Sequence, residues 1–293
     1  MPYSLKKSIL AFVFLIGAPV ILFAQSAPEV GIFAGISTYS GDMTEHTVTF
    51  RQSHPTIGFL IRKNIYKNFG LRLGVDFGKI SGADSLNADT SLRLRNLNFR
   101  SSLVDVHLLA EYNFFNYAET GFTPYVFLGI SVYHFNPYTL DSNGLKVYLP
   151  PLSTEGEGLP QYPDRKPYAL TQISVPFGVG VKYALSPTVN LGFEFRINKT
   201  FTDYLDDVST TYVDKNVLLA ARGPSAVYYS FRTNELPGHS KDSYPADGAQ
   251  RGSPTHKDWY YFTGVTLTFN LNGGGNGLFG KSIRQLRCPP LKK

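Results

Sequence analysis

The sequence predicts an all-β protein, an eight-stranded antiparallel transmembrane β-barrel preceded by a signal peptide. Eight segments alternate apolar and polar residues with the period of two that a half-buried strand produces. The connections between these segments are alternately short and long. After residue 24 no apolar run approaches the roughly 20 residues that a spanning helix needs. If the chain is in a membrane, it therefore crosses it as strands.

The strand pattern is clearest where Leu71, Leu73 and Val75 interleave with Arg72 and Gly74. One face of such a strand is apolar, and the other is polar or small. Eight is an even number of strands that can close into a barrel. The predicted strands cover residues 30–39, 57–61, 71–77, 104–114, 123–135, 175–183, 189–197 and 259–271.

The lengths of the connections distinguish a membrane barrel from a soluble one. Short turns alternating with long loops are the expected layout of an outer-membrane barrel with both termini in the periplasm. A soluble, ligand-holding barrel would not sort its loops in this way and would place apolar residues inside. The short connections are residues 66–68, 116–121 and 186–187; the long ones are 43–54, 82–100, 137–172 and 202–258, and the last of these contains a predicted helix at 215–221.

The first 24 residues have the order of a secretory signal peptide. Lys6 and Lys7 precede an apolar run at residues 9–23, which the small residue Ala24 follows. We expect cleavage after Ala24, and an uncleaved N-terminal anchor is the alternative. The remaining chain is then one barrel domain, residues 25–271, and a basic periplasmic tail, residues 272–293.

The positive charge of the exported chain is concentrated in this tail. Without Lys6 and Lys7 the chain has 26 basic and 22 acidic residues, and residues 278–293 hold five of the basic ones and no acidic one. The body is therefore close to neutral, which argues against nucleic-acid binding, since that needs positive charge on a folded face. The single cysteine, Cys288, excludes an intramolecular disulfide framework.

The parity of the strands directs four basic and four acidic residues, with one histidine, into the barrel. An eight-stranded barrel has room inside only for side chains. We favour a core of ion pairs that closes the lumen, and an ion path or acid–base site is the alternative. The predicted lumen network is Arg62, Arg72, Asp76, Asp105, His107, Glu111, Lys182, Glu194 and Arg196.

Aromatic residues gather at the end of the barrel with the short connections, where an interfacial girdle is expected. Scattered aromatic residues in ordinary strands would not cluster at one rim. The predicted girdle is Tyr66, Phe69, Phe114, Phe115, Tyr117, Phe122 and Tyr183.

No pattern in the sequence converges on catalysis. Gly275, Gly280, Lys281 and Ser282 match the spacing of a phosphate-binding loop, but the motif lacks the βαβ context that aims its amides at a phosphate. An outer-membrane lipid hydrolase could use His134, which has the apolar parity of its strand, yet nothing fixes a partner serine or a third group. No cluster has the spacing of metal ligands. We expect no enzymatic activity, no cofactor, no metal and no small-molecule substrate.

Three stretches resemble one family. They are EVGIFAGISTYSGD at residues 29–42, FTPYVFLGISVYHFNP at residues 122–137 and DWYYFTGVTLTFNL at residues 258–271. Together they are similar to the PorG-type barrel of the type IX secretion system, which also drives gliding motility. The resemblance implies a non-enzymatic structural component, in contact with outer-membrane lipid and with a lipoprotein of the periplasmic ring. The insert at residues 203–257 has no counterpart, and an OmpX-like or adhesin-like barrel is the alternative function.

The basic tail is the predicted docking segment for that partner. It follows the last strand through a glycine-rich linker at residues 273–277. An unpaired cysteine in an oxidising compartment suggests an intermolecular bond. The alternative is a solvated tail held by anionic lipid headgroups. The candidate docking residues are Lys281, Arg284, Arg287 and Cys288.

Overall fold

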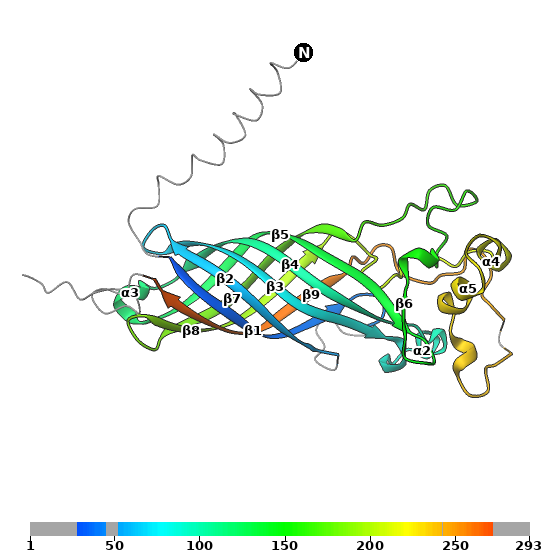
Figure 1. The fold of residues 1–293 in the computed structure, drawn as a ribbon, viewed down its shortest axis with the longest axis horizontal. Coiled ribbons are helices and arrows are strands. Elements are labelled where there is room, and N and C mark those ends of the chain that lie inside the picture. Colours follow the sequence, from blue (N-terminus) through cyan, green and yellow to red (C-terminus); the bar gives the residue numbers. More distant parts are fainter. Residues whose placement is uncertain (1–27, 45–51, 242, 272–293) are drawn as a thin grey trace, which may run out of the picture.

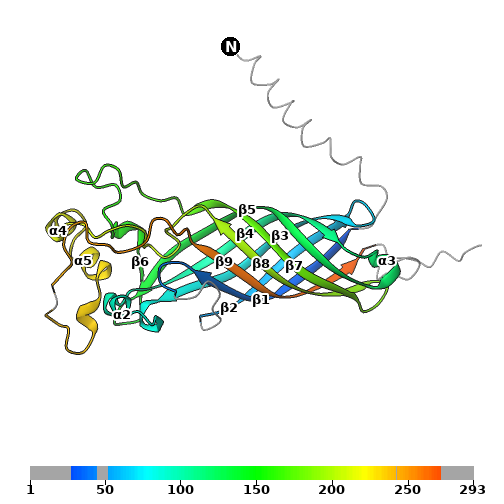
Figure 2. The same ribbon diagram turned by 180° about the vertical axis from the view of Figure 1, so that it is seen from behind.

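The computed structural model describes residues 28–44, 52–241 and 243–271, and eight of its strands close into an antiparallel barrel (Figures 1 and 2). The predicted fold class is confirmed. A further short strand, β6 (Lys146–Tyr148), pairs with the last residues of β5. The barrel strands are β1 (Glu29–Ser40), β2 (His54–Asn64), β3 (Phe69–Ala83), β4 (Asn98–Asn113), β5 (Phe122–Leu140), β7 (Thr171–Ala184), β8 (Val189–Thr200) and β9 (Trp259–Asn270).

The barrel closes because β9 pairs with β1 along the whole length of both strands. Two glycines face each other in this seam. A Cβ atom on Gly35 would overlap the carbonyl oxygen of Thr263, and one on Gly264 would overlap that of Ala34. Only glycine lets the two backbones approach this closely.

The outer wall of the barrel is apolar. Along β3, Leu73 is 53% exposed and Phe77 is 45% exposed, whereas the intervening Arg72 and Asp76 are 1% and 2% exposed. The same arrangement holds around the ring, with Phe59, Leu128 and other large apolar side chains facing outward. A continuous apolar wall around a closed ladder is the surface that a lipid bilayer covers. None of the described helices is long and apolar enough to cross a membrane.

Short turns lie at one end of the barrel, which we call the short-turn end. The described chain starts at Pro28 and finishes at Leu271 at this end, and the Leu271 amide donates to the Pro28 carbonyl. Helix α3 (Tyr117–Thr120) lies in one of the turns (Figure 1). Six of the seven predicted girdle residues are exposed here. Tyr117 is the exception, because its hydroxyl donates to Asn190 inside the mouth of the barrel (2.7 Å).

Long loops cover the other end and form what we call the loop cap, residues 84–97, 141–170 and 201–258 (Figure 1). The predicted helix at residues 215–221 is present as α4, and its N-terminus is capped by Asp214, which accepts from the amides of residues 216 and 217. The cap has an apolar cluster of its own, formed by Leu159, Val213, Leu218 and Ala226. Helix α4 covers Lys215–Arg222, and the other helical elements of the cap are η2 (Asp84–Leu86), α2 (Thr90–Arg95), η3 (Pro150–Leu152), α5 (Pro224–Ser230) and η4 (Thr233–Glu235).

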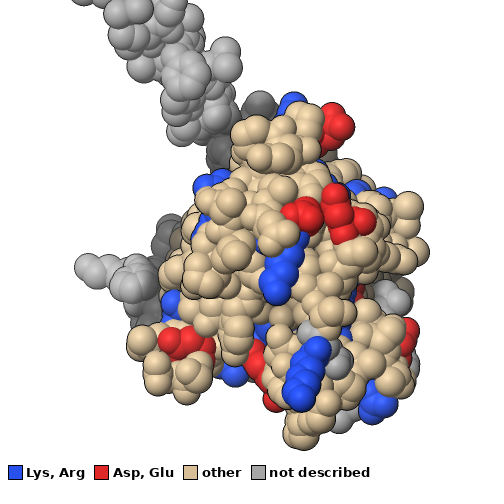
Figure 3. Space-filling view, turned by 90° about the vertical axis from the view of Figure 1, so that its right-hand side faces the viewer, with Lys and Arg blue, Asp and Glu red and all other residues tan. Residues whose placement is uncertain are grey.

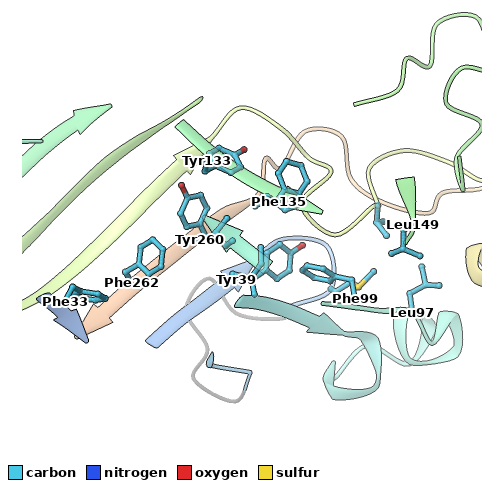
Figure 4. Close-up of a cluster of buried hydrophobic side chains, with 14 residues drawn as sticks. Phe33, Tyr39, Leu97, Phe99, Tyr133, Phe135, Leu149, Tyr260 and Phe262 are labelled. Atoms are coloured by element: carbon cyan, nitrogen blue, oxygen red, sulfur yellow. The ribbon is translucent and has the colours of Figure 1, made fainter. Parts of the chain in front are cut away.

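The barrel interior differs from the expectation of a polar lumen in the half nearer the loop cap. Phe33, Tyr133, Phe135, Tyr260 and Phe262 form part of one buried apolar cluster there (Figure 4). Aromatic rings meet edge to face in this cluster, with the Phe33 and Phe262 centroids 6.3 Å apart. The cluster continues into the cap through Leu97 and Leu149 (Figure 4). The cap side chains exclude water from this half, so apolar packing is favourable inside it.

Two predicted segments fall outside the described residues. They are the signal peptide at residues 1–24 and the tail at residues 272–293, which includes Lys281, Arg284, Arg287 and Cys288. Both stay predictions.

Candidate functional site

The structure places all nine residues of the predicted lumen network inside the barrel, each at most 4% exposed. They come from β2, β3, β4, β7 and β8 and fill the half of the interior nearer the short-turn end. Buried charges of this kind are tolerated only when they are paired and hydrogen-bonded. The pairing forms three layers along the barrel axis.

In the layer nearest the short-turn end, Glu111 is the common partner of three bases. Its carboxylate lies 2.9 Å from Arg62 Nε, 3.1 Å from Arg72 Nε and 2.6 Å from Lys182 Nζ. Arg62 also lies 3.3 Å from Glu29. Glu29 is a fifth buried acid, so the interior is not the balanced four-to-four set that the sequence suggested. The period of two in β1 could have revealed it, because Glu29 has the same parity as the inward-facing Phe33.

The middle layer joins opposite walls. Arg72 of β3 forms an ion pair with Glu194 of β8, and these strands are four positions apart in either direction around the ring of eight. The Tyr125 hydroxyl donates to the same Glu194 carboxylate (2.9 Å). The centroid of the Tyr125 ring also lies 4.2 Å from Lys182 Nζ. The sequence analysis did not predict that Tyr125 faces inward and contacts both Glu194 and Lys182, because it considered aromatic residues only at the rim of the barrel.

The third layer is a cluster of Asp76, Asp105 and His107, whose ligand atoms all lie within 4.8 Å of one another. These residues do not have the sequence spacing of metal ligands, and it is the pairing of β3 with β4 that brings them together. Arg196 already occupies the cation position. Its guanidinium forms an ion pair with Asp76 and lies 3.0 Å from His107 Nδ1. The Phe262 ring covers that guanidinium, with its centroid 4.4 Å from Arg196 Cζ. The cluster is an ion-pair centre as it stands.

His134, the hydrolase candidate, faces outward on the apolar wall. Its Nδ1 lies 2.9 Å from the hydroxyl of Thr171 on the neighbouring strand. The described residues bring no carboxylate into ion-pair contact with it. A catalytic triad needs a nucleophile, a base and a third group that orients the base, and this geometry supplies a hydroxyl and an imidazole only.

The loop cap contains a second charged region that the sequence did not reveal. Arg95 pairs with Asp84 (2.7 Å) and Arg251 pairs with Glu155 (2.9 Å). Further acids are buried, and the described residues provide them with no such partners. Burial raises the pKa of Asp203 to about 7 and, with the charges of Asp207 and Glu155, that of Glu157 to about 8. Acid-rich loop sequences are usually solvated, so only their folding over the barrel shows that these residues are buried.

Two openings lie at the ends of the barrel. At the short-turn end a polar mouth of about 780 Å³ is lined by Lys67, Asn116, Asn190 and other residues. On the loop cap a groove of about 920 Å³ is lined by Asp89, Tyr212, Lys241 and others. The charged layers and the aromatic cluster separate the two.

The chain has detectable similarity to one protein family and to several solved barrels. A family described as "Domain of unknown function (DUF6089)" matches residues 7–148. No curated protein matches the chain. Three solved structures illustrate the similarity in fold.

Neisserial surface protein A is 12% identical, with 83% of this chain and 96% of that chain covered and a TM-score of 0.40. The outer membrane protein OprG from Pseudomonas aeruginosa is 12% identical, with 84% and 98% covered and a TM-score of 0.36. A major outer membrane protein from Thermus thermophilus is 13% identical, with 83% and 99% covered and a TM-score of 0.40.

The class of β-barrel to which the chain belongs follows from its own architecture. The described barrel has an even number of strands, an apolar wall and a closed ladder, and the long loops that the structure describes in full lie at one end. These are the features of barrels that span outer membranes. The chain is a small transmembrane β-barrel of the outer-membrane type.

Proposed function

We propose that the chain is a closed, non-enzymatic outer-membrane anchor that presents a folded cap at the cell surface, in the manner of an OmpX-like or adhesin-like barrel. The observation that carries the proposal is the Arg72–Glu194 ion pair between opposite walls of the barrel. A side-chain bridge across the full width of a narrow barrel leaves no route for a solute.

The aromatic cluster adds a second barrier in series with the ion pairs. Tyr133, Phe135 and Phe262 are fully buried on the barrel axis side of their strands (Figure 4). A hydrated ion would have to displace both the charged layers and these rings. The structure therefore favours an anchor over a channel.

The loop cap supports a role in presentation. Its elements pack on their own apolar cluster and are joined by buried ion pairs. The cap is therefore a folded unit with a defined surface and not a set of separate loops. Figure 3 faces this end and shows basic and acidic side chains scattered together over a mostly uncharged surface. Such a surface does not favour a strongly charged partner such as nucleic acid.

Single-channel recording in planar bilayers tests the closed lumen. The purified protein is expected to show no stable conductance, and a variant that removes side chains from both barriers, Arg72→Ala with Glu194→Ala and Phe262→Ala, is expected to increase ion leakage. Lys67→Ala, at an exposed ion pair with Glu119, is the matched control. Stable conductance of the unaltered protein, absent from a mock purification, would contradict the proposal.

A second candidate function is anchoring of a type IX secretion machine through the periplasmic side. The polar mouth favours it, because Lys67 and Asn116 line this opening and have side chains that can hydrogen-bond to a protein partner. In this proposal the ring lipoprotein contacts the short turns and the basic tail.

Site-specific photo-crosslinking in cells tests this second function. A crosslinker at Lys67 or Asn116 is expected to capture a periplasmic lipoprotein, whereas one at Asp141 in the loop cap is the control. Equal capture from both ends, or none from the short-turn end, would exclude docking at this rim.

A further inference from the structure

Basic side chains lie on the outer wall of the barrel at the end nearer the loop cap. In the pairing of β3 with β4, Lys79 stands opposite Ser102, and Ser81 stands opposite Arg100. Lys79, Ser102 and Arg100 are exposed, whereas Ile80, which follows Lys79, is buried inside. Lys79 and Arg100 are thus diagonal neighbours on one face, about 7–8 Å apart. The two cations can contact one ligand together.

The positive charge continues onto the next two strands. Tyr138 of β5 stands opposite Arg100 of β4 on one side and opposite Tyr148 of β6 on the other. Lys146 of β6 has its Nζ 4.6 Å from the centroid of the Tyr138 ring. Figure 1 shows β6 at the cap end of the barrel. We call Lys79, Arg100 and Lys146 the basic belt.

No acid neutralises the basic belt within the part of the chain that the structure describes. No carboxylate there lies within ion-pair distance of its three cations. Asp141 is the acid nearest in sequence to Lys146, and its Oδ1 accepts hydrogen bonds from the amides two and four residues later. By contrast, the buried cap residues Arg95 and Arg251 each pair with a carboxylate. Unpaired positive charge on a folded face attracts anions.

A hollow adjoins the basic belt. It has a volume of about 460 Å³ and is lined by His54, Ser81, Arg100 and other residues. The hollow forms where the pairing of β3 with β2 has stopped at Phe77, while β3 continues to Ala83. His54 Nε2 lies 2.8 Å from Ser81 Oγ, which fixes the serine hydroxyl on the strand beside Arg100. An anion bound by Arg100 would therefore find hydrogen-bond donors as well as charge.

The position of the belt on the wall selects the class of anion. On β3, Lys79 lies two residues beyond Phe77, which is 45% exposed on the apolar wall. On β4, Arg100 has the same outward parity as Val106, which is 47% exposed. Two residues of a strand span about 7 Å, so the cations begin where the apolar wall ends. A ligand that covers both surfaces has an anionic headgroup and acyl chains, whereas a free anion would use the cations alone.

We propose that the basic belt binds the phosphate groups of an outer-leaflet glycolipid, whose acyl chains lie against the apolar wall of β3 and β4. Arginine pairs with phosphate through two parallel hydrogen bonds, and lysine adds a compact charge. Basic residues beside a membrane surface attract anionic lipids in this way. The inference rests on the proposed function, because the belt meets the outer leaflet only if the loop cap is at the cell surface.

Native mass spectrometry of the purified full chain in detergent micelles tests the site. Bis-phosphorylated lipid A is expected to bind more tightly than the same lipid without its phosphates. The combined variant Lys79→Gln, Arg100→Gln and Lys146→Gln should weaken binding of the phosphorylated lipid by about 100-fold, because each cation near an anionic surface contributes about fivefold. The variant should leave binding of the dephosphorylated lipid unchanged. Inorganic phosphate should not displace the lipid.

Lys199→Gln is the matched control. Lys199 is exposed at the cap end of β8, which lies four positions from β3 around the ring. Its substitution removes the same charge from the opposite wall and should leave lipid binding unchanged. Heat-dependent gel mobility shows that each variant is still folded. The proposal is overturned if both forms of the lipid bind equally, if the combined variant binds like the parent, if the control weakens binding as much, or if inorganic phosphate displaces the lipid.

A second measurement separates the lipid site from the proposed function. Binding in micelles does not depend on the orientation of the barrel in the cell. An epitope inserted after Gly238, in an open part of the cap, should be detected on intact cells. Detection only after permeabilisation would overturn the proposed function and the outer-leaflet source of the lipid. Detection on intact cells, with no preference for the phosphorylated lipid in micelles, would overturn the lipid site alone.

Discussion

Arg72 and Glu194 join opposite walls of the barrel, from β3 to β8, through a direct ion pair. Neither residue is exposed by more than 1%. The pair is supported by the Tyr125 hydroxyl on Glu194 and by Glu111 on Arg72, so it belongs to a continuous network. Closure of the lumen thus depends on residues 122 positions apart in the sequence.

Breaking this pair on one side should destabilise the barrel strongly. Arg72→Met leaves the Glu194 charge buried with a single tyrosine donor, and losses of about 3–5 kcal/mol are typical of such a change. The double variant Arg72→Met with Glu194→Met should recover much of the loss. Urea unfolding in vesicles measures both. Lys67→Met, at an exposed pair 3.5 Å from Glu119, is the control and should change stability by well under about 1 kcal/mol. A cost no larger than that of the control would show that the pair contributes little.

Removing Arg196 should turn an ion-pair centre into a metal site. Arg196→Ala leaves Asp76, Asp105 and His107 as two carboxylates and an imidazole around an empty cation position. We expect a lower melting temperature in chelator and a partial recovery on refolding with Zn²⁺, which these donor types bind. The parent protein should not respond to Zn²⁺. An equal response from both proteins would assign the effect to another site.

The glycines of the β1–β9 seam should be essential for closure. Gly264→Val places side-chain atoms against the Ala34 carbonyl, and backbone cannot move aside without losing the ladder. The variant should lose the heat-dependent gel shift of a folded barrel. Ala34→Val, on the exposed wall of the same seam, is the control and should fold normally. Normal folding of Gly264→Val would mean that the seam can rearrange.

The loop cap should lose stability as the pH rises. Burial raises the pKa of Asp203 from 3.8 to about 7 in the folded protein; the charges of Asp42 and Glu155 add to this shift, and Lys257 opposes it. Between these pKa values the folded cap holds a proton that the unfolded loop releases. The stability linked to this proton is therefore fully present below about pH 4 and is lost as the pH rises through about 7. Proteolysis of residues 201–258 should be faster at pH 8 than at pH 5.

Asp203→Asn should flatten this profile, because the amide does not titrate. Asp141→Asn should leave the profile as it is in the parent. Greater protease resistance at pH 8 than at pH 5 would contradict the assignment of the titrating group.

The sequence by itself determined the class of fold and the direction of the charged side chains. Alternation with a period of two is a local property, because successive residues of any strand point to opposite faces. For that reason the strands, the order of short and long connections, and the inward parity of Arg62, Glu111 and Lys182 could be predicted without a structure. The helix at Lys215–Arg222 was predictable for the same reason, since its signals are local.

Only the tertiary structure decided which charges meet. Parity places Arg72 and Glu194 inside, but ring closure and register set them opposite each other. The contacts of the long loops could not be predicted either. Asp206 and Asp258, which both lie within hydrogen-bond distance of the Tyr39 hydroxyl, come from the start and the end of one long loop. They become neighbours only because this loop folds back on the barrel. The aromatic cluster in the cap-side half depends on that same cover, because water exclusion by the cap makes apolar packing inside favourable. Pairing across a closed barrel and burial beneath long loops are non-local, and no local pattern encodes them.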